Sequence, residues 1–456
     1  MVSSLLFEGE QPLCKRFPNE KFIVGVEGGG TTFAVSIARV LELDKIRSYE
    51  NEQVKMESDP KSLGLEILLE KEFPTADRPQ ETLDEIVKFL QFHKNSTPVY
   101  SALGLACFGP LGVDPERSST YGTILASSPK ANWREVDILT PLLKACSVDG
   151  TKYIPHKIET DVNAPAFAEF TAEKQHHPDS KLSSIAYVTV GTGVGVGLVV
   201  NNKTVHGMLH PEGGQVCVQP YENDNFPGYS WGEKCPYKGK NTVEGMSCSV
   251  SLVERLEFMQ REENTIHLIK NSPDGNARDI LKNLENTHPI WDYAARGLAN
   301  LCVTLILVNS VERIVFGGGI MRRGEPLLEK IRKETKELLN GYIDTKELRD
   351  MKSFIAPSRF GESAGIIGAL MLGKVANEEY HNSLKPSKTS FLGGFGPATK
   401  HEDDSKTITV KASTVANNLF WNGFATGICV AAVLAVVLLN LDSKSRASPQ
   451  QFLAKR

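Results

Sequence analysis

The sequence has no surplus of positive charge: 51 Lys and Arg residues stand against 55 Asp and Glu residues, a formal net charge of -4. A protein that binds the phosphate backbone of nucleic acids needs a cationic surface, so we expect no nucleic-acid partner. Apolar residues are not scarce, because 41% of the 456 residues are hydrophobic. That content excludes a wholly disordered chain and suffices for two domains with cores of their own.

Cysteine pairs of the Cys-x-x-Cys type are absent, although the chain holds eight cysteines. The N-terminal residues also contain no apolar stretch of the signal-peptide type. Scattered cysteines without these features are typical of reduced thiols in a protein that faces the cytosol. We expect most of them to act as small hydrophobic residues of the core, which excludes a small disulfide scaffold.

Charged residues are missing between Lys411 and Asp442, and residues 419–439 read LFWNGFATGICVAAVLAVVLL. A helix of this length spans about 31 Å at 1.5 Å per residue, which matches a hydrocarbon core of about 30 Å. We therefore expect a transmembrane helix at 416–441, a single-pass tail anchor in the lipid bilayer with the large body in the cytosol and a short tail at 442–456. The alternative is a buried core helix, which the solvated flanks disfavour.

The rest of the chain divides by composition. Residues 1–20 show no periodicity and are predicted to form a disordered leader. Strand-like apolar runs then alternate with helical runs, which is typical of an α/β protein. Residues 377–415 are rich in Ser, Gly, Pro and charge, so we expect a flexible tether there.

Two segments repeat the order strand, glycine turn, strand. They read FIVGVE-GGGTT-FAVSIARV over 22–40 and IAYVTV-GTGVG-VGLVV over 185–200. Because apolar alternation with a period of two resumes after the glycines, each segment predicts a β-hairpin. A dinucleotide-binding fingerprint would need a helix to open at the glycines, whereas residues 196–200 are strand-like.

Glycines without Cβ atoms let the backbone approach a phosphate and direct its N–H groups toward it. Two such hairpins in two halves of the chain predict a duplicated fold that binds one nucleotide, although either hairpin alone could be purely structural. A third glycine run, 317–319, follows the strand-like RIVF at 313–316 and precedes an amphipathic helix at 326–339. A flat nucleoside can pack against backbone there.

Three carboxylates are candidates for chemistry. Asp161 lies between a predicted strand and a predicted helix, where it could cap the helix. Alternatively it is a base, because phosphoryl transfer to a hydroxyl needs one residue that orients the hydroxyl and takes its proton. Glu212 and Glu244 lie in glycine-containing segments and could accept hydrogen bonds from sugar hydroxyls, or they could be ordinary surface residues.

Taken in order, the motifs resemble those of the ROK family of sugar kinases, and within it the fructokinase branch. They include GVEGGGTTFAVSIA, ACFGP, TYGTILASSPKANW, TDVNAPAFAEF, YVTVGTGVGVGLVV, HPEGGQ, VEGMSCS, IVFGGGIM and SAGIIGALML. The resemblance implies a two-lobed, actin-like ATPase fold with duplicated RNase H-like cores. The N-terminal lobe would cover 21–163 and the C-terminal lobe 164–376, with the final helix, about 361–374, in either lobe.

The resemblance also implies phosphoryl transfer from ATP, with Mg²⁺, to the 6-hydroxyl of a hexose. D-fructose is the first candidate, mannose or glucose are alternatives, and a sugar-binding protein without turnover is the alternative from another class. Asp161 would be the catalytic base. ATP would be bound by Gly28, Gly29, Gly30, Thr31, Thr32, Gly191, Thr192, Gly193, Gly317, Gly318 and Gly319. The sugar would be bound by Asn163, Glu212, Gln215, Glu244, Gly109 and Pro110. A homodimer is left open.

The first loop departs from the family's usual Asp-x-Gly-Gly-Thr-Lys. Glu27 replaces the Asp, as is common in the fructokinase branch, and Thr32 replaces the Lys. Loss of that cation would weaken a phosphate contact, and Lys130 could supply a substitute.

The family's structural zinc site is also incomplete in this sequence. Cys235 is kept, but Gln215 and Lys238 replace two His residues, and the last Cys falls at Asn241 or Thr242. A closed structural zinc site needs four nitrogen or sulfur ligands, so we predict no zinc and no other protein-held metal. In relatives, the His at the position of Gln215 also contacts the sugar. Its replacement by Gln215 therefore leaves the choice of hexose open.

Overall fold

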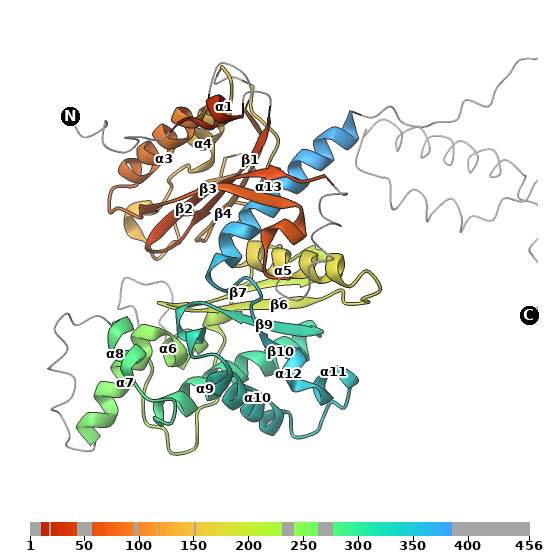
Figure 1. Cartoon of the computed structure of the whole chain (residues 1–456). Helices are drawn as coiled ribbons and strands as arrows, with labels where there is room; N and C mark the ends of the chain where they lie inside the picture. Colours follow the sequence, from red (N-terminus) through yellow and green to blue (C-terminus); the bar gives the residue numbers. More distant parts are fainter. Residues whose placement is uncertain are drawn as a thin grey trace, which may run out of the picture. The chain divides into compact units, whose positions relative to one another are not determined.

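The structure is a computed structural model, and it describes residues 11–17, 20–42, 57–94, 99–117, 119–149, 152–229, 241–262 and 277–384. These residues form two lobes, each built on a five-stranded mixed sheet (Figure 1). Within these ranges we find no helix that is both long and apolar enough to cross a membrane. The expected transmembrane helix and the tail lie outside the described residues.

The N-terminal sheet has the strand order β3-β2-β1-β4-β5. Its strands are β1 (Phe22–Gly28), β2 (Thr32–Val40), β3 (Leu65–Pro74), β4 (Tyr100–Cys107) and β5 (His156–Thr160). The β1–β2 and β2–β3 pairs are antiparallel, whereas β4 pairs parallel with both β1 and β5. The hairpin predicted around the first glycine run is therefore confirmed.

The C-terminal sheet repeats this pattern with the order β10-β9-β6-β7-β8. Its strands are β6 (Ile185–Val190), β7 (Val194–Val200), β8 (Lys203–Thr204), β9 (Arg313–Gly317) and β10 (Ile355–Pro357). The β6–β7 and β7–β8 pairs are antiparallel, whereas β9 pairs parallel with both β6 and β10. The second predicted hairpin, β6–β7, is therefore confirmed as well. The two sheets are thus the same topology built twice along one chain.

Two long helices join the lobes, namely α5 (Asn163–His176) and α13 (Ala364–Ser383). Helix α13 packs on β1 and β4, α5 packs on β7, and the two helices contact each other between the sheets (Figure 1). The approach of α13 to β4 is close, because a Cβ atom on Gly104 would lie 1.8 Å from the carbonyl oxygen of Ala369. The last helix therefore returns to the N-terminal sheet.

The remaining helices are divided between the two lobes. The N-terminal lobe carries α1 (Leu13–Arg16), η2 (Pro60–Leu63), α3 (Pro79–His93), η3 (Ala131–Trp133) and α4 (Leu139–Cys146). The C-terminal lobe carries η4 (Gly213–Gln215), α6 (Val243–Ser247), α7 (Ser249–Glu262), α8 (Ala277–Asn283), α9 (Ile290–Thr304), η5 (Leu305–Asn309), η6 (Gly319–Arg323), α10 (Glu325–Leu339), α11 (Lys346–Arg349), α12 (Met351–Phe354) and η7 (Gly361–Ser363).

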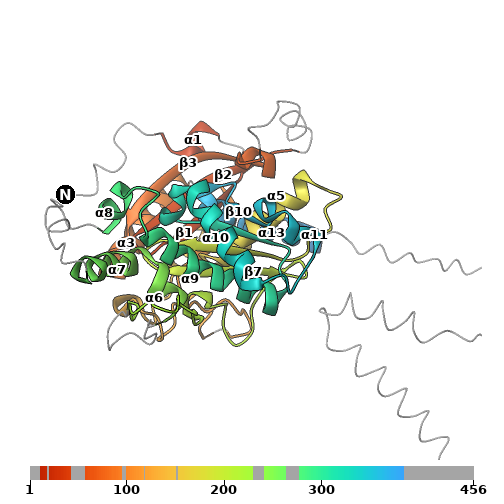
Figure 2. The ribbon, with the colours of Figure 1, turned by 90° about the horizontal axis from the view of Figure 1, so that it is seen from below.

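Helices α9 and α10 lie side by side over the C-terminal sheet (Figure 2). Alternate residues of β6 point to opposite faces, as the period of a strand requires. Val188 and Val190 join the cluster that includes α9 and α10, whereas Ile185 and Tyr187 join the cluster that includes α5 and α13. The sheet is thus buried on both faces, which keeps its strand ends, and the loops that follow them, in fixed positions.

Two boundaries differ from the sequence-based expectations. The predicted leader contains α1, where Leu13 is fully buried and donates its N–H to Nδ1 of His93 at 3.4 Å. Helix α13 continues through residues 377–383, which were predicted to belong to the tether. No Gly or Pro interrupts this stretch, and Glu379 pairs with Lys157 at 3.1 Å, so the helix extends past the buried core.

Candidate active site

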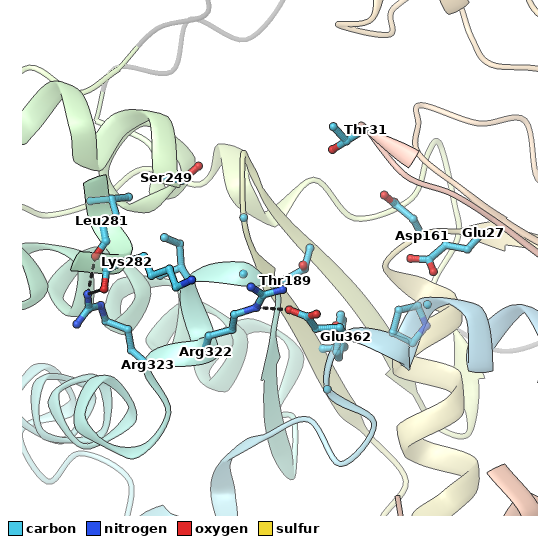
Figure 3. Close-up of a pocket in the computed structure, with 18 of the residues that line it drawn as sticks. Glu27, Thr31, Asp161, Thr189, Ser249, Leu281, Lys282, Arg322, Arg323 and Glu362 are labelled. Atoms are coloured by element: carbon cyan, nitrogen blue, oxygen red, sulfur yellow. Dashed lines mark hydrogen bonds and ion pairs between the residues drawn. The ribbon is translucent and has the colours of Figure 1, made fainter. Parts of the chain in front are cut away.

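A cavity of about 780 Å³ lies between the two lobes. The N-terminal lobe contributes Glu27, Thr31 and Asp161 to its wall, and the C-terminal lobe contributes segments that include Gly191 and Ser249 (Figure 3). Because β1, β4 and β5 are parallel, their carboxyl ends meet at one edge of the sheet, and that edge faces the cavity. Ligands of α/β sheets commonly bind at such an edge.

Asp161 follows β5 directly, and its N–H donates to the carbonyl oxygen of Cys107 at 3.0 Å. Its carboxylate does not cap α5, because the first residue of that helix, Asn163, donates its N–H to Oγ1 of Thr160 at 3.1 Å. The Asp161 side chain instead forms part of the cavity wall (Figure 3). Of the two interpretations offered by the sequence, the geometry favours the one in which Asp161 meets a ligand.

The two carboxyl groups of this edge have different pKa values. Burial raises the pKa of Asp161 to about 6, with Glu212 adding to the rise and His210 opposing it. Burial also raises the pKa of Glu27 to about 8, and the charge of Asp161 adds to that rise. Near neutral pH, Asp161 is therefore mostly ionised and can accept a proton, while Glu27 is mostly protonated. Neighbouring carboxyls with separated pKa values are typical of acid–base sites.

The first glycine turn closes through a hydrogen bond from the N–H of Gly29 to the carbonyl oxygen of Thr32 at 2.8 Å. Thr75 on the neighbouring strand end donates its Oγ1 proton to the carbonyl oxygen of Gly29 at 2.9 Å. Thr31, at the tip, lines the cavity. Gly28, Gly29, Gly30 and Thr32 belong to the same turn but do not themselves contribute to the cavity wall.

The second glycine turn closes through a hydrogen bond from the N–H of Gly191 to the carbonyl oxygen of Gly193 at 2.9 Å. Its position is fixed by α7, because Ser249 donates its N–H to the carbonyl oxygen of Gly191 at 2.8 Å. Gly191 lines the cavity, and Thr192 and Gly193 complete the turn beside it. One glycine turn from each lobe thus reaches the same cavity.

The third glycine run contributes Gly318 and Gly319 to the cavity wall. Gly318 has φ 90°, and a Cβ atom there would lie 2.6 Å from the carbonyl oxygen of Val190 at the end of β6. Only glycine fits this conformation and this approach. Gly317 is buried against the Tyr187 hydroxyl rather than at the cavity wall.

Beyond the third run, the cavity wall continues with Trp291 and Arg323. The Arg323 guanidinium lies 3.9 Å from the Trp291 ring centroid and donates to the carbonyl oxygen of Leu284 at 2.6 Å. Arg322, next to it, pairs with Glu362 (Figure 3). None of these residues was identified from the sequence, because nothing local marks them and the fold alone brings 281–291 beside 318–323.

Four of the expected sugar-binding residues form two contact chains. The Gln215 amide donates to Oε1 of Glu244 at 3.1 Å, and Oε2 of Glu244 accepts the N–H of Val194 on the second hairpin at 3.0 Å. Oε1 of Glu212 lies 3.2 Å from Nε2 of His210. Gly109 completes the second chain, and the buried Pro110 follows it: a Cβ atom on Gly109 would lie 2.9 Å from the His210 ring.

Asn163 lies elsewhere than expected for a sugar ligand. Its side chain is fully buried, and Oδ1 accepts the N–H of Leu198 at 2.9 Å. Its amide donates to the carboxylate of Glu159 and to the carbonyl oxygen of Val205, both at 3.3 Å. Because its side-chain atoms are already bonded within the protein, the geometry assigns Asn163 to holding α5 against β7 rather than to contacting sugar.

The described residues contain no group of three or more His, Cys, Asp or Glu side chains placed to hold a metal ion. Cys235 and Lys238, at two of the family's zinc positions, lie outside those residues. Gln215 bonds to Glu244, and the Thr242 hydroxyl caps α6 by accepting the N–H of Gly245 at 3.0 Å. Glu27, the carboxyl group beside the first turn, would have to lose its proton before it could help hold a nucleotide-bound Mg²⁺.

Two repeated sheets that bring one glycine turn each to a shared cavity, with an ionisable Asp at the sheet edge, fit the class of actin-like ATPases. The family model of the ROK family matches residues 62–376. The chain therefore belongs to the ROK family, as its motifs predicted.

Named relatives and a solved structure agree with this assignment. The chain is 30% identical over 356 residues to a putative fructokinase of Bacillus subtilis, covering 77% of this chain and 95% of that protein. It is 32% identical over 369 residues to a fructokinase of Zymomonas mobilis, covering 79% and 99%. A ROK family glucokinase from Streptomyces griseus, solved with glucose and AMPPNP, superposes with a TM-score of 0.52 at 19% identity, covering 78% and 99%. That last likeness supports the fold.

Proposed function

We propose that this protein transfers the γ-phosphoryl group of ATP to the 6-hydroxyl of a hexose, with D-fructose as the preferred acceptor. The observation that carries the proposal is the shared cavity, which is lined by Asp161 together with Thr31 and Gly191 from the glycine turns of the two lobes. The two relatives named above support fructose in particular, since both carry the name fructokinase and match nearly their whole length.

In this proposal the Asp161 carboxylate accepts the proton of the sugar 6-hydroxyl as its oxygen attacks the γ-phosphorus of ATP. The new O–P bond forms while the bond from the γ-phosphorus to the β-bridging oxygen breaks, which releases ADP. Both glycine turns reach the cavity, and their backbone N–H groups that do not close the turns would bind phosphate oxygens. An Mg²⁺ ion bound with ATP would neutralise phosphate charge, and an ionised Glu27 would help to hold it.

A coupled assay that measures ADP release with a panel of hexoses tests which sugar is the preferred substrate. We expect ADP release with fructose at a higher kcat/KM than with mannose or glucose. A preference for mannose or glucose would keep the kinase and reject fructose. Thermal stabilisation by sugar without any ADP release would instead support a sugar-binding protein that lacks turnover.

Lys130 is the candidate for the phosphate contact that Thr32 cannot make. A Cβ atom on Gly30 would lie 3.9 Å from Cε of Lys130, so this side chain stands beside the first turn. Lys130→Met should raise the KM for ATP by about ten-fold or more, since it removes a charge-assisted hydrogen bond of roughly 1.5–3 kcal/mol. Steady-state kinetics measures this, with the exposed Lys203→Met on β8 as the control. Equal KM values in the two variants would contradict the role.

We further propose that residues 416–441 anchor the protein in a membrane with its catalytic body in the cytosol. Support comes from the uncharged interval between Lys411 and Asp442. Val430 lies next to the centre of the apolar run 419–439, and an Arg at the centre of a bilayer is strongly unfavourable. The full chain should remain in the membrane pellet after alkaline extraction, whereas Val430→Arg should shift it to the supernatant. Wild-type protein in the supernatant would reject the anchor.

A further inference from the structure

His210 is a buried residue beside Glu212 and Gly109, two residues predicted to bind the sugar, and the sequence did not single it out. It lies in the loop between β8 and η4 and is 9% exposed. Its Nε2 atom is 3.2 Å from Oε1 of Glu212. Its other ring nitrogen, Nδ1, is buried and has no hydrogen-bond partner among the described residues.

The position of the His210 ring is fixed by its neighbours. A Cβ atom on Gly109 would lie 2.9 Å from Cε1 and 3.1 Å from Nε2 of the ring, so the ring packs on bare backbone at Gly109. The ring is also close enough to Asp161 to act on its carboxylate electrostatically. His210 therefore lies beside Gly109 and Glu212, which the family resemblance predicts at the sugar, and near Asp161, the proposed base.

A second unpaired polar atom occurs in the same part of the molecule. The Gln215 amide nitrogen donates to Glu244, but the Gln215 oxygen Oε1 is buried without a partner among the described residues. Buried polar atoms are almost always hydrogen-bonded, and an unpaired one is destabilising. His210 lies two residues before Glu212 and Gln215 three residues after it, so these two atoms indicate that the loop leaves hydrogen-bonding capacity open for a ligand.

We propose that His210 is a substrate-binding residue, whose Nε2 holds Glu212 and whose Nδ1 forms a hydrogen bond with a hydroxyl group of the hexose. The inference rests on the proposed function and deepens it by naming a further contact to the acceptor. Gln215 accepts a hydrogen bond from a second hydroxyl through Oε1. A hexose with several adjacent hydroxyl groups satisfies both atoms at once, and a smaller alcohol does not.

Two variants of the full chain separate the two ring nitrogens. The amide of Asn can occupy the place of Nδ1 but cannot reach Glu212, whereas the amide of Gln can occupy the place of Nε2 but leaves the Nδ1 position empty. If the hydroxyl contact is real, His210→Gln weakens fructose binding by about ten-fold to a hundred-fold, and His210→Asn weakens it less. If His210 only orients Glu212, the order of the two variants is reversed, and that result overturns the proposal.

Calorimetric titration of fructose in the absence of ATP measures this order directly, and the KM for ATP is the control. We expect the KM for ATP to stay within about two-fold of wild type in both variants, since their effect is confined to the sugar. Equal fructose affinity in wild type and His210→Gln also overturns the proposal. Should both variants fail to fold, Gly109→Ala, which displaces the ring, is expected to weaken fructose binding ten-fold or more, and unchanged affinity there contradicts the contact.

Deoxy sugars identify the hydroxyl group. Fructose analogues that each lack one hydroxyl should include one that wild type binds about ten-fold to a hundred-fold more weakly and that His210→Gln binds as well as it binds fructose. Discrimination that persists unchanged in His210→Gln for every analogue contradicts the inference. Wild-type protein that binds fructose but releases no ADP rejects the kinase while the calorimetry still decides the role of His210. Wild-type protein that binds no hexose rejects both.

Discussion

Asp161→Asn is expected to lower kcat by about 10²- to 10⁴-fold, the usual loss when a general base is removed. The exchange keeps the size of the side chain, and Asn cannot accept the proton of the attacking hydroxyl. KM values for ATP and hexose should change much less, because the glycine turns and the residues predicted to bind the hexose are unchanged. Steady-state kinetics with fructose and Mg·ATP measures the effect, and a kcat equal to that of wild type would reject Asp161 as the base.

The matched control is Asp179→Asn, the same chemical change at an exposed site in the loop between α5 and β6. Its kcat should equal that of wild type. Folding provides a second control, because the pKa of Asp161 is raised from its ordinary 3.8 to about 6 in the folded protein. The contribution of Asp161 to the free energy of unfolding is therefore favourable below the unfolded pKa, where the carboxyl group is protonated. This contribution is lost as pH rises through 6. Asp161→Asn should therefore unfold at pH 8 no more easily than wild type.

The same pKa predicts how activity depends on pH. The base must be ionised to accept a proton, so kcat/KM for the hexose should fall ten-fold per pH unit below about pH 6. The residual activity of Asp161→Asn should not show this fall in kcat/KM below pH 6. A wild-type profile that stays flat from pH 7 down to pH 5 would contradict the assignment.

Gly318→Ala is expected to abolish most ATP binding and to destabilise the C-terminal lobe. The Cβ atom would lie 2.6 Å from the carbonyl oxygen and 2.7 Å from the nitrogen of Val190, on a backbone with φ 90°. Neither atom can move without distorting the end of β6, which leads into the second glycine turn. We expect the KM for ATP to rise more than ten-fold, and overpacking of this kind typically costs about 1–3 kcal/mol of stability.

Gly324→Ala is the control for backbone strain alone. Gly324 has φ 64°, but a Cβ atom there would meet nothing within 4 Å. This variant should lose some stability while its KM for ATP stays close to that of wild type. If Gly324→Ala and Gly318→Ala raise the KM for ATP equally, the close approach at Val190 has no role in nucleotide binding.

The two hairpins were predictable because their signal is local. The alternation of period two on both sides of each glycine run fixes strand, turn and strand, and the structure has these elements at β1–β2 and β6–β7. Their shared cavity followed from the duplication and not from either segment alone. Asp161 was predictable as a candidate, because an acidic residue between a strand and a helix is visible in the sequence, but two interpretations of it stayed open until the fold was known.

Other features depend on contacts between distant parts of the chain, which a single sequence does not specify. Trp291 and Arg323 meet only through the packing of the C-terminal lobe, and His210 is noticeable only because Gly109 comes to lie against it. Asn163 was expected at the sugar because the family resemblance implied it, yet the first turn of α5 directs its side chain into the protein. The position of Leu13 in α1 likewise depends on a tertiary contact, the hydrogen bond from its N–H to His93 of α3.

A structure of the full chain with a non-hydrolysable ATP analogue and fructose tests the central claim most directly. We predict that the triphosphate lies between the turns at Thr31 and Gly191, with the fructose 6-hydroxyl about 2.6–3.2 Å from the Asp161 carboxylate. A nucleotide bound to one turn only, or a sugar whose 6-hydroxyl lies far from Asp161, would contradict the account.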